Sequence, residues 1–113
     1  MRYYSEAETK HLRTAFEDTV LRWPEVSTKK MFGCPCYQVR GKLFAFLVTG
    51  GIVITRLPDR GRKALSQVVP TGSFRAGKKT VARWVTLRVK ATKDLDRLMP
   101  FVKKSYRSAL RDE

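Results

Sequence analysis

The sequence has little histidine, little cysteine and few acidic residues. Its 113 residues include one histidine, two cysteines and ten aspartates and glutamates. A structural zinc site needs about four ligands, so the composition predicts that no metal is bound. A single histidine and scattered acids also leave few candidates for a general base. We therefore expect no catalytic residues and no cofactor, and we predict that the protein is not an enzyme.

Long hydrophobic runs are also missing. The longest uncharged stretch, Leu43 to Thr55, is too short to span a bilayer and is interrupted by Gly50-Gly51. The N-terminus, Met1 to Glu6, lacks the apolar core of a signal peptide. The sequence thus predicts a cytoplasmic protein with no membrane partner. Its length and its 42% of hydrophobic residues fit a single domain over residues 1–113.

The two cysteines flank a proline, as Cys34-Pro35-Cys36. Residues two apart on an extended strand point the same way, but their Cα atoms are near the upper limit for a disulfide. The simplest interpretation is two reduced thiols that pack as small apolar side chains. A redox role, or a metal shared between molecules, is the alternative.

Positive charge is abundant and unevenly placed. Lysine and arginine total 24, which gives a formal net charge of +14 at pH 7. Residues 1–28 carry a net −1, residues 29–55 carry +4 and residues 91–113 carry +2. Residues 56–90 hold ten basic side chains against Asp59 alone. That regional excess is more than solubility requires and favours a polyanionic partner, although a solvated face is the alternative.

The apolar pattern predicts a helix at the start of the chain. It ends at about Trp23, before Pro24, and Ser5 and Glu8 have the spacing of a capping box. His11 lies beside the apolar stripe and is expected to be exposed or half-exposed rather than catalytic. The stripe consists of Leu12, Ala15, Phe16, Val20 and Trp23.

Short extended runs follow. Gly33 to Leu57 predicts a three-stranded antiparallel meander, and Asp59 to Val68 a short helix that begins after Pro58. Ser73 to Ala76 and Arg83 to Val89 predict two more strands. A last helix contains Pro100, which must kink it or mark its start. The order α-β-β-β-α-β-β-α predicts a two-layer α+β fold with a five-stranded antiparallel sheet and three helices.

The last predicted strand has two different faces. One face is apolar, and the other combines an indole, a hydroxyl and two cations, which suits phosphates and base stacking. The alternative is a solvated sheet face on which the indole is partly covered. The apolar face consists of Val85, Leu87 and Val89, and the other of Trp84, Thr86, Arg88 and Lys90.

Basic residues also gather at a predicted hairpin tip, Lys78-Lys79, and on the short helix that precedes it. A basic tip can lie along a phosphate backbone or enter a groove. Gly72 to Lys79 nearly matches a phosphate-binding loop, but Lys79 replaces the hydroxyl residue and a strand follows instead of a helix. The predicted nucleic-acid-binding residues are Arg60, Arg62, Lys63, Arg75, Lys78, Lys79, Arg83, Trp84, Arg88 and Lys90.

Short motifs occur in a fixed order along the chain: Lys30-Met31-Phe32-Gly33, Arg40-Gly41-Lys42-Leu43-Phe44-Ala45, Thr55-Arg56-Leu57-Pro58, Phe74, Gly77-Lys78 and Trp84-Val85. Together they resemble the TfoX N-terminal domain family over about Lys29 to Leu110. Ser105-Tyr106-Arg107 is similar to the related YjbR/MmcQ-like proteins. From the residues themselves, Met31 and Phe32 are expected to fill core space, and Gly33 to permit a backbone conformation closed to other residues.

The resemblance implies a compact α+β fold like that of the YjbR-like and secretion-chaperone-like domains. It implies no established enzymatic activity. Proteins of this family are linked to competence regulation with the transcription machinery, and the YjbR-like domains to DNA binding through wing-like hairpins. The wings here would be the Gly50-Gly51 turn and the Lys78-Lys79 loop.

Two functions remain open from the sequence. The first is a nucleic-acid-binding or transcription-associated domain. The second is a protein-interaction module that binds an acidic partner, as a monomer or a homodimer. A homodimer would need an exposed apolar patch, which Tyr37, Phe44 and Phe46 could supply if the sheet were not fully covered.

Overall fold

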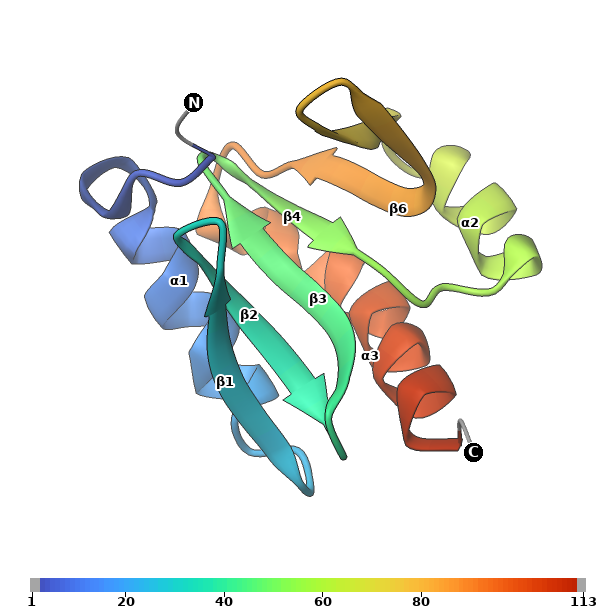
Figure 1. Cartoon of the computed structure of the whole chain (residues 1–113), viewed down its shortest axis with the longest axis horizontal. Helices are drawn as coiled ribbons and strands as arrows, with labels where there is room; N and C mark the ends of the chain where they lie inside the picture. Colours follow the sequence, from blue (N-terminus) through green and yellow to red (C-terminus); the bar gives the residue numbers. More distant parts are fainter. Residues whose placement is uncertain (1–2, 112–113) are drawn as a thin grey trace.

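The sheet and its helices are visible in a computed structural model, which describes residues 3–111 (Figure 1). Met1 and Arg2, part of the stretch predicted not to be a signal peptide, lie outside the described residues. The helices are α1 (Glu6–Val20), α2 (Asp59–Ser66), a 3-10 turn η1 (Thr92–Asp94) and α3 (Leu95–Arg111). The strands are β1 (Val26–Met31), β2 (Cys34–Val39), β3 (Lys42–Val48), β4 (Gly51–Ile54), β5 (Thr71–Ala76) and β6 (Lys79–Arg88).

The sheet is antiparallel throughout, in the order β1-β2-β3-β4-β6-β5. The α+β class and the antiparallel sheet were predicted, but the sheet has six strands and not five. The missed strand is β1, which pairs with β2 from Val26 opposite Val39 to Met31 opposite Cys34. Its four central residues are exposed, so it lacks the alternation of apolar and polar residues by which a strand is recognised.

Two tight turns connect the first three strands. Phe32-Gly33 and Arg40-Gly41 are two-residue loops in which all four φ angles are positive, between 54° and 78°. Such turns match the twist of a hairpin. The prediction for Gly33 is therefore confirmed, and Met31 is half-buried. The prediction for Phe32 is wrong, because this side chain sits on the turn and is 54% exposed.

The main core lies between the sheet and the helices α1 and α3, which cover the same face (Figure 1). Phe16 of α1 packs on Tyr37, and Tyr106 of α3 packs on Phe44. Tyr37, Phe44 and Phe46 are fully buried, so the exposed apolar patch suggested for a homodimer does not exist. At β2 and β3 the sheet is covered on both sides, which the sequence pattern of these strands could not show.

The first helix ends earlier than predicted, at Val20, and its capping box does not form. Ser5 is the N-cap residue, but its side chain makes no capping bond. Its backbone amide donates instead to Thr49 Oγ1 at 2.8 Å. α3 is continuous through Pro100.

The second face of the sheet carries a smaller core under the β5–β6 hairpin. The hairpin reaches this face because β6 contains a bulge. Ser73 pairs with Val85 and the next residue, Phe74, pairs with Val81, so three β6 residues have no partner on β5. β6 bends at this point and the hairpin turns back over the sheet (Figure 1). The buried residues of this core are Cys34, Cys36, Phe46, Val53 and Phe74.

The other predicted elements differ in their ends. The short helix ends at Ser66 and not at Val68, and β5 begins at Thr71 and not at Ser73. β6 begins at Lys79 and not at Arg83; its first residues were missed because the bulge interrupts the alternation of the strand. Val85, Leu87 and Val89 face the main core, as predicted. Within residues 3–111, no helix is long and apolar enough to cross a membrane.

Candidate functional site

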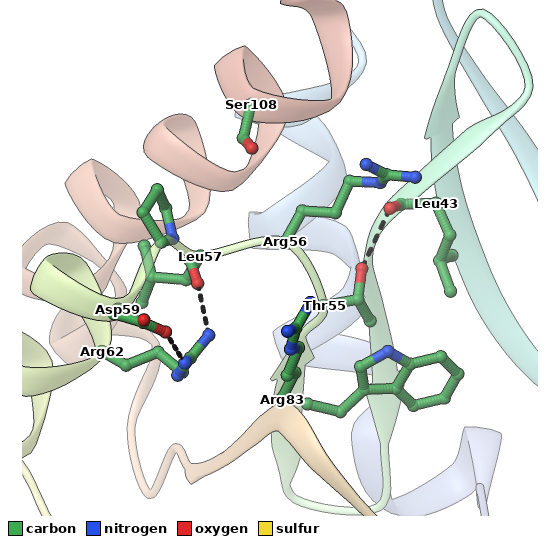
Figure 2. A pocket seen from close by; sticks show the side chains of 10 residues that line it. Leu43, Thr55, Arg56, Leu57, Asp59, Arg62, Arg83 and Ser108 are labelled. Atoms are coloured by element: carbon green, nitrogen blue, oxygen red, sulfur yellow. Dashed lines mark hydrogen bonds and ion pairs between the residues drawn. The ribbon is translucent and has the colours of Figure 1, made fainter. Parts of the chain in front are cut away.

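An open cleft of about 560 Å³ lies where the end of β4, the start of α2, the bulge of β6 and the side of α3 meet (Figure 2). Three arginines line it, Arg56, Arg62 and Arg83, and we call it the arginine cleft. Trp84, Thr55 and Ser108 also line it, together with the carboxylate of Asp59. It is therefore a cationic cleft with an aromatic wall and two hydroxyl groups.

Arg62 is held in place from two sides. Its guanidinium donates to the backbone carbonyl of Leu57 at 2.9 Å and pairs with the carboxylate of Asp59 one turn earlier on α2. Figure 2 shows both interactions at the edge of the cleft. Only part of the guanidinium is used in this way, because it carries five N–H donors. The remaining donors are available to a ligand in the cleft.

Arg56 is positioned through its backbone by α3. Its amide donates to Ser105 Oγ at 2.9 Å, and the Ser105 hydroxyl donates to the carbonyl of Phe44 at 2.7 Å. Ser105 is fully buried, so this pair of bonds fixes α3 to the chain between β4 and α2. The Thr55 hydroxyl donates a further hydrogen bond to the carbonyl of Leu43 at 3.0 Å.

The bulge of β6 places Arg83 and Trp84 in the same cleft. Consecutive residues of a regular strand point to opposite faces, but Ala82, Arg83 and Trp84 lie between the β5-paired residues Val81 and Val85. Arg83 is exposed and has no hydrogen bond or ion pair among the described residues. Trp84 is half-buried.

A second cavity, of about 250 Å³, adjoins the first at Pro58 and lies between α2 and α3. Pro58 lines both cavities. Arg60 of α2 lines the second one with three α3 residues at spacing i, i+3 and i+7, which puts them on one face of the helix. We call the seven basic residues of the two cavities the basic groove: Arg56, Arg60, Arg62, Arg83, Lys104, Arg107 and Arg111.

The structure brings four of the predicted binding residues to the basic groove or its wall: Arg60, Arg62, Arg83 and Trp84. Arg88 and Lys90 line a different cavity with Arg97 and Leu98, beyond the other end of β6. The remaining predicted residues line neither cavity of the groove and are exposed elsewhere on the surface: Lys63, Arg75, Lys78 and Lys79.

Arg56 and the three α3 residues Lys104, Arg107 and Arg111 were not predicted from the sequence. The three α3 residues lie within residues 91–113, whose net charge is only +2, whereas Arg56 lies in the strongly basic segment 56–90 and was not singled out there. The spacing of the three α3 residues was the signal that could have found them, since positions i, i+3 and i+7 share a helix face.

The two turns predicted to act as wings, Gly50-Gly51 and Lys78-Lys79, both have hydrogen bonds to the N-terminal segment beside them. The amide of Gly77, beside Lys78, donates to the hydroxyl of Tyr3 at 3.0 Å. The other turn is bonded through Thr49, whose amide donates to the carbonyl of Tyr3 at 3.0 Å. The stretch from Gly72 to Lys79 forms β5 and its turn, which agrees with the rejection of a phosphate-binding loop.

The two thiols are buried in the core of the second face. Burial raises the pKa of Cys34 and of Cys36 to about 11, because an apolar environment disfavours the thiolate. Both cysteines are free and pack as small apolar residues, as predicted. His11 is exposed on α1, also as predicted. Within residues 3–111, no three His, Cys, Asp or Glu side chains gather as a metal site would require.

The fold and the groove define a class of protein: an α+β domain with helices on one face of an antiparallel sheet and a cationic cleft at one side of it. The chain matches the TfoX N-terminal domain over residues 18–109, and it belongs to that family. The match spans both walls of the arginine cleft, from β3 to α3. No curated protein and no solved structure matches the chain significantly.

Proposed function

We propose that this protein is a non-enzymatic nucleic-acid-binding domain and that the basic groove is its contact surface. The observation that supports this most strongly is the composition of the groove. Seven basic residues from four segments of the chain line two adjoining cavities, and among the described lining residues Asp59 is the only acid. Its carboxylate is already paired with Arg62.

The chemistry of the groove fits a phosphate backbone. Six of its seven cations are arginines, whose planar guanidinium binds phosphate through two parallel hydrogen bonds. A row of such groups releases counterions when it binds a polyanion, which makes the affinity fall steeply with salt. We propose that these contacts position the backbone.

The proposal is tested by fluorescence-anisotropy titration with a short duplex and a short single strand. If about four phosphates are neutralised, the affinity falls about a hundredfold between about 50 and 200 mM salt. The double variant Lys104→Gln/Arg107→Gln removes two exposed cations of the groove, so we expect it to bind more weakly and to lower the salt slope by about two.

Two other double variants, each of which also removes two positive charges, serve as controls. Lys29→Gln/Lys30→Gln removes two exposed lysines from β1, which lies at the far edge of the sheet, and should leave the salt slope unchanged. Lys78→Gln/Lys79→Gln tests the hairpin tip. If all three variants lower the affinity equally, only net charge matters and the groove is not the site. If the tip variant alone weakens binding, the hairpin is the contact surface.

A further inference from the structure

The aromatic wall of the arginine cleft has a feature that phosphate binding alone does not explain. The ring of Trp84 packs edge-to-face on Phe46, with 5.4 Å between the ring centroids, and tilted on Phe74 at 5.8 Å. Phe46 is fully buried and Phe74 is 5% exposed, so one side of the indole packs against buried rings. The part of Trp84 that is not covered by this core lines the cleft.

The bulge puts a cation directly beside this platform. Arg83 precedes Trp84 in the chain, and both line the same cleft because neither is paired with β5. Figure 2 shows the Arg83 guanidinium and that of Arg62 both extending into the cleft. An indole beside guanidinium groups can take a ligand that has a flat ring and a phosphate, which is the chemistry of one nucleotide.

The size and shape of the cleft favour an unpaired nucleotide. Its volume of about 560 Å³ is in the usual range for pockets that hold one small molecule. The bases of a duplex are paired and stacked inside the helix, so their faces cannot reach a wall of this kind unless a base leaves the stack. An unpaired base exposes its face and can stack on an aromatic side chain.

We infer that the arginine cleft holds one unpaired nucleotide of a single strand, with its base on Trp84 and its phosphate between Arg83 and Arg62. This inference rests on the proposed function and adds to it a preference for single strands. Arg60, Lys104, Arg107 and Arg111 then follow the backbone of the neighbouring nucleotides along the groove.

The two tryptophans of the chain allow a direct test. Trp23 is half-buried against the main core, where its ring packs on Tyr106, and Trp84 lies on the opposite face of the sheet. In the variant Trp23→Phe, only Trp84 reports on binding. We expect an oligothymidylate or an oligouridylate to quench this emission, with half-saturation at the concentration that half-saturates the anisotropy signal. In the matched variant Trp84→Phe, which keeps an aromatic ring against Phe46 and Phe74, the emission of Trp23 should not change.

The probes distinguish the sources of the nucleotide. Quenching by thymidine monophosphate at the same concentration as by the strand would overturn the assignment to a strand, because the neighbouring phosphates would then contribute nothing. Unchanged Trp84 emission at a strand concentration that saturates the anisotropy would overturn the inference and leave the proposed function standing. Absence of anisotropy binding to any strand or duplex would overturn both.

A further substitution measures the preference for single strands. Trp84→Leu keeps an apolar side chain in the core of the second face and removes the flat platform. Base stacking on an aromatic side chain predicts a loss of about 5- to 150-fold in affinity for the single strand. The affinity for a blunt duplex should stay nearly the same. An equal loss for both would show that the variant damages the groove as a whole and would contradict the inference.

Discussion

Ser105 joins α3 to the arginine cleft through a single hydroxyl. It accepts a hydrogen bond from the amide of Arg56 and donates one to the carbonyl of Phe44, and Ser105 is fully buried. An apolar residue in place of Ser105 could not accept the hydrogen bond from this amide. A buried amide without a partner is destabilising. This hydroxyl therefore affects both the stability of the fold and the position of one wall of the cleft.

We expect Ser105→Ala to lower the free energy of unfolding by about 1–3 kcal/mol, because the Arg56 amide loses its acceptor. Ser108→Ala is the matched control. Ser108 lies one turn further along α3 and lines the cleft without being buried, so its loss should change stability by less than about 0.5 kcal/mol. Urea unfolding followed by circular dichroism measures both. Equal stability of the two variants would show that the buried hydrogen bonds contribute nothing.

Individual site residues could be predicted only where the local sequence marked them. Arg62 and Arg83 lie in the strongly basic middle of the chain, and Trp84 was noticed from its place on a strand. Arg56 and Arg107 were missed, because their contribution depends on how α3 packs beside the end of β4. The role of Ser105 could not be predicted for the same reason. A serine connects two elements only when the fold places a donor and an acceptor beside its hydroxyl, as it does here with the Arg56 amide and the Phe44 carbonyl.

Among the elements, β4 and β6 approach each other unusually closely at Gly51. A Cβ atom at this position would lie 2.3 Å from the carbonyl oxygen of Leu87 in the neighbouring strand. No side-chain adjustment can relieve a contact with backbone. The pairing of β4 with β6 therefore requires glycine at this position.

We expect Gly51→Ala to lower the free energy of unfolding by about 3 kcal/mol, because β4 and β6 must separate to admit the methyl group. Gly72→Ala in β5 is the control, since a Cβ there meets nothing within 4 Å. It should leave stability unchanged or raise it by up to about 1 kcal/mol. Thermal melting compares the two. A Gly51→Ala variant as stable as Gly72→Ala would contradict the close approach.

The strands and helices that carry regular apolar patterns were predicted, and α2 was predicted from its start at Pro58 and Asp59, but the edge strand β1 was not. α1, β3 and α3 owe their apolar residues to one shared core, so their periodicity was visible in the sequence. β1 is an edge strand with exposed residues, and its place depends on pairing with β2 rather than on burial. The bulge of β6 was also not predicted, since three unpaired residues inside a strand leave no signal in its composition.

The charge of the whole molecule opposes its own folding. A formal net charge of +14 creates repulsion in the folded state, where the charges are closest together. Exposed ion pairs such as Arg40–Glu25, at 3.0 Å, offset little of it, because each such pair contributes less than about 1 kcal/mol. Added salt therefore reduces the repulsion among the basic residues by more than it reduces the attraction within the ion pairs.

We expect added sodium chloride to raise the melting temperature and, over the same range, to weaken nucleic-acid binding. Screening shortens the range of the repulsion between basic residues and of the attraction to phosphates alike. Thermal melting by circular dichroism and anisotropy titration, carried out in the same salt series, measure the two effects. A melting temperature that falls with salt would show that the ion pairs outweigh the net charge.

The walls of the arginine cleft come from positions as far apart as Leu43 and Ser108. No short fragment of the chain can reproduce them, so a ligand that fills the cleft binds the folded molecule and not the unfolded chain. Mass action then shifts the folding equilibrium, by about 2.7 kcal/mol when the free ligand is at a hundred times its dissociation constant. Local openings that separate α3 from the bulge of β6 become rarer by the same factor, so occupancy protects both elements against proteases and amide exchange.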